Sequence, residues 1–190
     1  NSRFILSDEN HETPTSVDFT RLKIAVTNFK VYGPEIYANI QKMSFLDHRG
    51  VYIKNLKGNY SFTQQHMILD KMELKTEEST IKGYAALNYE IEDFSDFVNK
   101  VEFDFKLKSA KIASNDIRCF YNELEKNRVF KIRSHITGPL NNLKLLDLSL
   151  NDNRGTRLMG FINFKNLLGS KDQKFYMNGK FDHLSSNYND

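Results

Sequence analysis

The chain has 190 residues, 39% of them hydrophobic, and a formal net charge of +3 from 27 basic and 24 acidic side chains. These charges are interspersed along the chain, which predicts a mixed polar surface and no nucleic-acid partner. The single cysteine excludes an intrachain disulfide framework and a thiolate metal cluster. No apolar run reaches the roughly 18–20 residues of a transmembrane helix. Because the chain begins Asn1-Ser2-Arg3-Phe4, with no initiator methionine and no signal-peptide pattern, we interpret it as an internal piece of a longer protein.

The stretch around which the chain is organised is residues 69–89. Hydrophobic side chains occupy every second position on both sides of the polar residues 76–79. A period of two indicates a β-strand with one apolar face, and a polar turn between two such runs indicates a hairpin. The 15 phenylalanines and 9 tyrosines, with no tryptophan, are residue types that strands favour.

The same alternation recurs along most of the chain and predicts about ten strands in one curved, twisted, antiparallel sheet. Besides the central hairpin, strands are expected over residues 18–32, 37–45, 51–56, 58–63, 101–107, 129–136, 145–150, 157–164 and 175–181. Gly33-Pro34, residues 47–50 and Gly138-Pro139 carry turn signals. Two stretches break the alternation.

These two stretches are expected to contain short helices. Phe94, Phe97 and Val98 have helical spacing within residues 92–99. Residues 114–125 are the least strand-like part of the chain, and Asn115 or Asp116 is a candidate helix cap. Cys119 is expected to be a small core residue.

The hairpins near residues 69–89 and 145–164 are alike, and they indicate a weak internal repeat within one segment, residues 1–190. In each hairpin, an apolar strand is followed by a polar turn, and the returning strand begins with Ser or Thr, an apolar residue and Gly. Many antiparallel sheets share such a pattern, so the alternative is an ordinary sheet without repeats. Gly83, Gly160 and Gly179 lie in mid-strand, where glycine marks a bend or a close backbone approach, and they favour strong curvature.

The sequence carries no recognisable catalytic chemistry. It contains no P-loop, dinucleotide fingerprint, G-x-S-x-G elbow or H-E-x-x-H. Its five histidines are scattered, mostly in predicted turns, and are expected at the surface. We therefore predict that the chain is not an enzyme, with no catalytic residue, no metal and no cofactor.

Several motifs in order resemble the TamB family of the AsmA-like superfamily, in the form found in Bacteroidetes. The motifs are loose and cover nearly the whole chain from residue 18. They are 31–40 (VYGPEIYANI), 50–56 (GVYIKNL), 74–81 (LKTEESTI), 114–117 (SNDI) followed by Phe120, 136–140 (ITGPL) leading to 148–150 (LSL), and 155–158 (GTRL) before 160–162 (GFI).

What the resemblance implies is a segment of a long periplasmic protein, anchored in the inner membrane of a Gram-negative envelope and reaching the outer membrane. Such proteins are similar to bridge-like lipid transfer proteins, in which a β-groove carries phospholipid or another amphipathic lipid. Family members also associate with outer-membrane barrels of the Omp85 type. The alternative function is therefore an interaction or assembly scaffold for outer-membrane proteins, which uses exposed sheet edges for strand addition. The anchor helix and the C-terminal family domain are not found within these 190 residues.

A conduit for acyl chains needs a continuous apolar wall, because the hydrophobic effect and dispersion are non-directional. The other explanation of the same residues is an ordinary sandwich core covered by a second sheet. The side chains predicted to line the groove are Ile81, Leu87, Val101, Phe103, Phe105, Leu107, Phe130, Ile132, Leu148, Leu158, Ile162, Phe175 and Met177.

Overall fold

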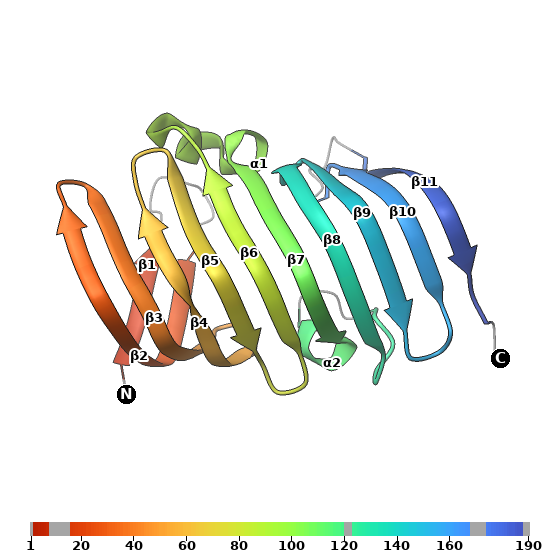
Figure 1. Ribbon diagram of the computed structural model, residues 1–190, viewed down its shortest axis with the longest axis horizontal. Coiled ribbons are helices and arrows are strands. Elements are labelled where there is room, and N and C mark those ends of the chain that lie inside the picture. Colours follow the sequence, from red (N-terminus) through yellow and green to blue (C-terminus); the bar gives the residue numbers. More distant parts are fainter. Residues whose placement is uncertain (1, 8–15, 120–122, 168–173, 188–190) are drawn as a thin grey trace.

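The computed structural model describes residues 2–7, 16–119, 123–167 and 174–187. Together they form one antiparallel sheet of eleven strands, in which the spatial order from β1 to β11 follows the sequence (Figure 1). The first and last strands are not paired with each other, so the curved sheet is open. The predicted fold class, a mainly β chain built as a long curved antiparallel sheet, is confirmed.

Most strands are longer than the alternating runs that predicted them, and the two runs expected at 51–56 and 58–63 form a single strand. Their bounds are Ser2–Ser7 (β1), Ser16–Tyr32 (β2), Glu35–Asp47 (β3), Tyr52–Phe62 (β4), His66–Lys75 (β5), Thr80–Asn88 (β6), Glu102–Ala113 (β7), Val129–Pro139 (β8), Asn142–Asp152 (β9), Arg157–Lys165 (β10) and Tyr176–Ser185 (β11). The turn expected at Gly138-Pro139 lies two residues later, at residues 140–141. Pro139 is the last residue of β8, where its missing N–H interrupts no further pairing.

Both predicted helical insertions are present, and the second is shorter than expected. Between β6 and β7 lie a 3-10 helix, η1 (Ile91–Asp96), and one turn of α-helix, α1 (Phe97–Lys100). After β7 comes α2 (Ser114–Ile117), and residues 120–122 of the expected helix fall outside the described residues. The cap expected at Asn115 or Asp116 is wrong, because Ala113 precedes the first turn. Cys119 is exposed at the end of this turn, so its expected place in the core is also wrong.

A line of β-bulges crosses the middle of the sheet. Residues 41–42 of β3, 70–71 of β5, 108–109 of β7 and 146–147 of β9 are extra residues in the pairing with the strands that follow. Lys71 and Asp147 have positive φ angles of 50° and 49°. A bulge bends its strand and increases the local twist, so a line of bulges bends the sheet along its whole length.

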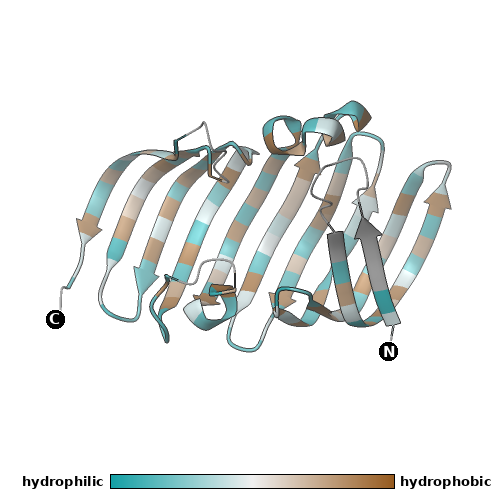
Figure 2. Ribbon diagram, turned by 180° about the vertical axis from the view of Figure 1, so that it is seen from behind, coloured by the Kyte–Doolittle hydropathy of each residue, from teal (hydrophilic) through white to brown (hydrophobic). Residues whose placement is uncertain are grey.

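Further bulges bend β2 so strongly that its first part leaves the plane of the sheet. Two breaks in the β2–β3 pairing include Arg21 and Asn28, whose φ angles are 55° and 52°. As a result β1 lies behind the sheet in Figure 1 and in front of it in Figure 2. Phe19 packs against Phe45 of β3, with ring centroids 4.3 Å apart. The sheet therefore curls over at its N-terminal edge.

Carboxylates close three of the turns at one end of the sheet. Asp47, the last residue of β3, accepts hydrogen bonds from the backbone N–H and the Nε–H of Arg49 in the following turn, at 2.9 and 2.7 Å. Asp116 of α2 reaches the β5–β6 turn and accepts from the hydroxyls of Thr76 and Ser79, each at 2.5 Å. The hydrogen bond from Arg49 holds the pKa of the Asp47 carboxyl below its usual value, against the opposing effect of burial. These contacts fix the hairpin ends so that the strands stay in register.

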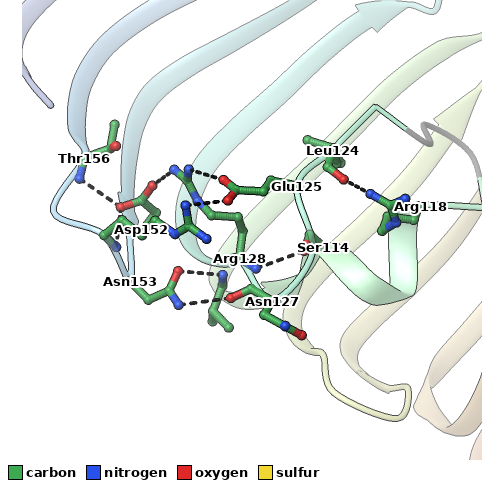
Figure 3. A network of polar contacts seen from close by, with 11 residues as sticks. Ser114, Arg118, Leu124, Glu125, Asn127, Arg128, Asp152, Asn153 and Thr156 are labelled. Atoms are coloured by element: carbon green, nitrogen blue, oxygen red, sulfur yellow. Dashed lines mark hydrogen bonds and ion pairs between the residues drawn. The ribbon is translucent and has the colours of Figure 1, made fainter. Parts of the chain in front are cut away.

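The third carboxylate, Asp152, joins the α2 segment to the β9–β10 turn (Figure 3). Its side chain is fully buried beside the guanidinium of Arg128 and accepts from the backbone N–H groups of Arg154 and Thr156, both at 2.8 Å. Burial alone would raise the pKa of this carboxyl, but these donors lower it overall. Arg128 in turn donates its backbone N–H to the Ser114 hydroxyl at 3.0 Å. The connection after β7 is thus bound to the neighbouring hairpin.

Candidate functional site

The most continuous feature of the molecule is a row of apolar side chains that crosses ten strands. Residues opposite each other in adjacent strands share a face of the sheet, so the register defines the row. Its members are Ile24, Met43, Leu56, Leu74, Ile81, Ala110, Ile132, Leu150, Leu158 and Leu184, one from each strand from β2 to β11. With strands about 4.8 Å apart, nine intervals make a row of about 43 Å. We call the side of the sheet that carries it the apolar face.

Two more rows run beside it on the same face. One contains Tyr60, Leu69, Ala85, Phe105, Ile136, Leu145 and Ile162. The other contains Phe62, Met67, Leu87 and Phe103 on β4 to β7. Colouring by hydropathy shows the alternation along the strands that produces these rows (Figure 2). The apolar face is therefore several side chains wide.

Large and small side chains alternate in a fourth row, along the line of bulges. Odd-numbered strands contribute Met72, Leu107 and Phe181, and even-numbered strands contribute Gly83 and Gly160 opposite them. A Cβ atom on Gly83 would overlap the carbonyl oxygen of Lys106, and one on Gly160 would overlap that of Lys180. Gly83 and Gly160 thus lie where the backbone of the next strand leaves no room for a Cβ atom.

The apolar face is open. The described residues form one sheet, so no second sheet among them covers this face, and the sandwich core considered above is not what they build. Side chains on the outer strands are the most exposed: Ile24 of β2 is 56% exposed and Leu184 of β11 is 61% exposed. Soluble monomers rarely leave an apolar patch of this extent uncovered, and such patches mark binding surfaces.

A hollow of about 350 Å³ lies on this face over β3 to β7. Its lining is almost entirely hydrophobic and includes Leu69, Leu87 and Phe105, with Phe97 of α1 at one side. A chain of ring contacts connects the helical insertion to the sheet, with centroids 6.0 Å apart for Phe97 and Phe103 and 5.1 Å for Phe103 and Phe105. The helical insertion therefore closes one end of an apolar concave surface.

The opposite face is polar and held by ion pairs, so we call it the polar face. Lys82 contacts Glu73 at 3.0 Å, and His135 contacts Asp104 at 2.7 Å. Lys106 lies over the ring of Tyr84, 5.2 Å from its centroid. The sheet thus presents hydrocarbon on one side and charge on the other.

The register places most of the predicted lining residues on the apolar face. They are Ile81, Leu87, Phe103, Phe105, Leu107, Phe130, Ile132, Leu148, Leu158, Ile162 and Met177.

The other two predicted lining residues lie elsewhere. Val101 precedes β7 at the end of α1 and is completely buried, so it packs beneath the helical insertion and contributes no open surface. Phe175 precedes β11 and stacks on Phe164, with centroids 6.1 Å apart. Its own side chain is 55% exposed.

Sequence reasoning missed several members of the rows because the bulges change which residues share a face. Leu145 and Leu148 are three positions apart and still lie on the same face, since residues 146–147 form a bulge. Leu69 and Met72 of β5 are related in the same way. No glycine marks either bulge, so the sequence offers no signal for the change.

Within the described part of the chain, no three His, Cys, Asp or Glu side chains come together as possible metal ligands. In the same described part, no helix is long and apolar enough to cross a membrane.

The chain matches no family model, no curated protein and no solved structure.

Proposed function

We propose that this chain binds the acyl chains of phospholipid or another amphipathic lipid along its apolar face, as one segment of a conduit. The observation that carries the proposal is the uninterrupted row of ten apolar side chains, uncovered by any second layer among the described residues. A wall of this kind has no directional contacts, so a bound acyl chain can slide along it without meeting a deep energy minimum.

The wider setting is proposed from the resemblance in sequence. There the chain would belong to a periplasmic protein that is anchored in the inner membrane, carries lipid toward the outer membrane and meets an Omp85-type barrel. The polar face, with ion pairs such as Lys82–Glu73, suits a conduit that stands in water.

The proposal is tested by titrating the purified chain with fluorescent fatty acids of increasing length. Each methylene placed against the apolar face contributes about 0.8 kcal/mol, so affinity should rise about fourfold for each added CH₂. Affinity that is independent of chain length would contradict the proposal, because it would mean that the head group alone is bound.

The open edges of the sheet favour a second candidate, a scaffold that binds extended peptides by strand addition. In β11, residues 176–184 are all exposed, and β2 has no β1 partner beyond Leu22. Unpaired edges of this length are templates for a further strand. This candidate requires peptide to bind with main-chain pairing at an edge while the apolar face stays empty.

A further inference from the structure

Four basic side chains form a straight row on the polar face, although they are far apart in the sequence. Thr80 is opposite both Lys75 and Lys111, Lys111 is opposite Lys131, and Asn151 is opposite both Lys131 and Arg157. We call Lys75, Lys111, Lys131 and Arg157 the basic row. All four side chains are exposed.

Within the described residues, the basic row lacks the direct ion pairs that neutralise other lysines on this face, although Glu73 is near enough to Lys75 to interact with it electrostatically. Lys82 contacts Glu73 and Lys106 contacts Asp104, at 3.0 and 3.8 Å. Within the described residues, no ion pair joins a member of the basic row to an acidic group. Like charges directly opposite each other in a sheet are destabilising, as they are at Lys111 and Lys131. An anion bound along the row would relieve this repulsion.

Carboxylates lie beside the row, which limits what it can bind. Glu77 and Glu78 lie at the turn on one side of the row, and on its other side Glu73 lies opposite Lys82. A broad anionic surface such as a bilayer would be brought against these carboxylates as well as against the cations. A linear anion laid along the row would avoid them.

The length and chemistry of the row favour an extended acidic peptide. From β5 to β10 there are five strand intervals, or about 24 Å, the length of about seven extended residues. Surfaces that bind single-stranded nucleic acid place aromatic rings between their cations. In the basic row, the residues between the cations are Thr80 and Asn151, which have no ring on which a base could stack. Tyr84, an aromatic residue of this face, is already covered by Lys106. Thr80 and Asn151 can instead donate hydrogen bonds to carboxylates.

We propose that the basic row is a docking site for an acidic, extended polypeptide segment of a partner protein. The site lies on the polar face and is independent of the proposed lipid path on the apolar face. Its affinity is electrostatic, so it should fall as salt is added.

The test is the binding of a fluorescein-labelled peptide of eight glutamates, followed by anisotropy at low and at moderate salt. Lys111→Gln with Lys131→Gln should weaken binding at least tenfold. The matched control is Lys144→Gln with Lys165→Gln, which removes the same charge from exposed lysines of the polar face near the opposite ends of the strands. This control should change the affinity less than twofold.

Equal weakening by the two double variants would overturn the proposal, because it would show attraction to net charge alone. Vesicles containing phosphatidylglycerol and an oligonucleotide of eight thymidines are titrated in parallel. The proposal is also overturned if the Lys111 and Lys131 variant loses binding to either of these probes while its peptide binding stays unchanged.

Discussion

A protein that carries Leu69→Glu and Phe105→Glu should bind fatty acids about a hundredfold more weakly than the unchanged chain. Both residues line the hollow on the apolar face, and both are half-buried. In the empty protein the new carboxylates can stay hydrated, because the hollow is open. A bound acyl chain would strip that water away, and an unpaired charge in a dry apolar site is very costly. A hundredfold corresponds to about 2.7 kcal/mol.

The matched control for this variant is Lys106→Gln with Lys144→Gln, on the polar face. It changes the net charge by the same amount and should leave fatty-acid affinity within twofold of the unchanged chain. Circular dichroism should show the same strand content for all three proteins. If the two double variants bind fatty acid equally well, the apolar face is not where acyl chains are held.

Replacing Gly83 by alanine should lower the free energy of unfolding by about 3 kcal/mol. The added Cβ would overlap the carbonyl oxygen of Lys106 in β7, and this backbone atom cannot move without disturbing the β6–β7 ladder. Urea unfolding followed by circular dichroism measures the change. Gly160→Ala should behave similarly, because its Cβ would overlap the carbonyl oxygen of Lys180.

Gly33 provides the comparison for these glycines. It lies in the β2–β3 turn with a φ of 55°, and a Cβ there would meet no atom within 4 Å. Gly33→Ala should therefore lower the free energy of unfolding by only about 1 kcal/mol, because alanine is disfavoured in the left-handed backbone conformation. If Gly83→Ala is no more destabilising than Gly33→Ala, the close approach at the bulge line does not determine the packing of the strands.

The sheet could be predicted from sequence because its signal is local. Alternation in β7, where Phe103, Phe105 and Leu107 are separated by charged residues, indicates a strand with one apolar face wherever the strand ends up. Polar turns then join each strand to the next. The open, curved sheet follows from hairpin after hairpin without any long connection.

The positions of the bulges could not be predicted, and with them part of the apolar face was missed. Lys71 and Asp147 take positive φ angles at bulges although neither is glycine. The neighbouring strands impose this conformation, and the local sequence contains no signal that predicts it. The prediction that Val101 lines the groove is wrong for a related reason. Alternation places Val101 on the same face as Phe103, but the preceding helical turn buries its side chain.

The basic row could not be predicted from the sequence, for a different reason. Lys75, Lys111, Lys131 and Arg157 lie far apart along the chain, so the sequence does not show them as a cluster. Only the register of six strands brings them into one line. Charge patterns on a sheet depend on pairing, which composition does not contain.

The central claim is that lipid acyl chains travel along the apolar face, and photocrosslinking tests it most directly. A photoreactive amino acid is placed at Phe105 or at the adjacent Lys106 within the full-length protein in cells. Phe105 lies in the hollow and Lys106 lies on the polar face. Labelled phospholipid should be captured from position 105 and not from position 106. Capture of proteins from both positions, with no lipid at position 105, would contradict the conduit and favour the scaffold.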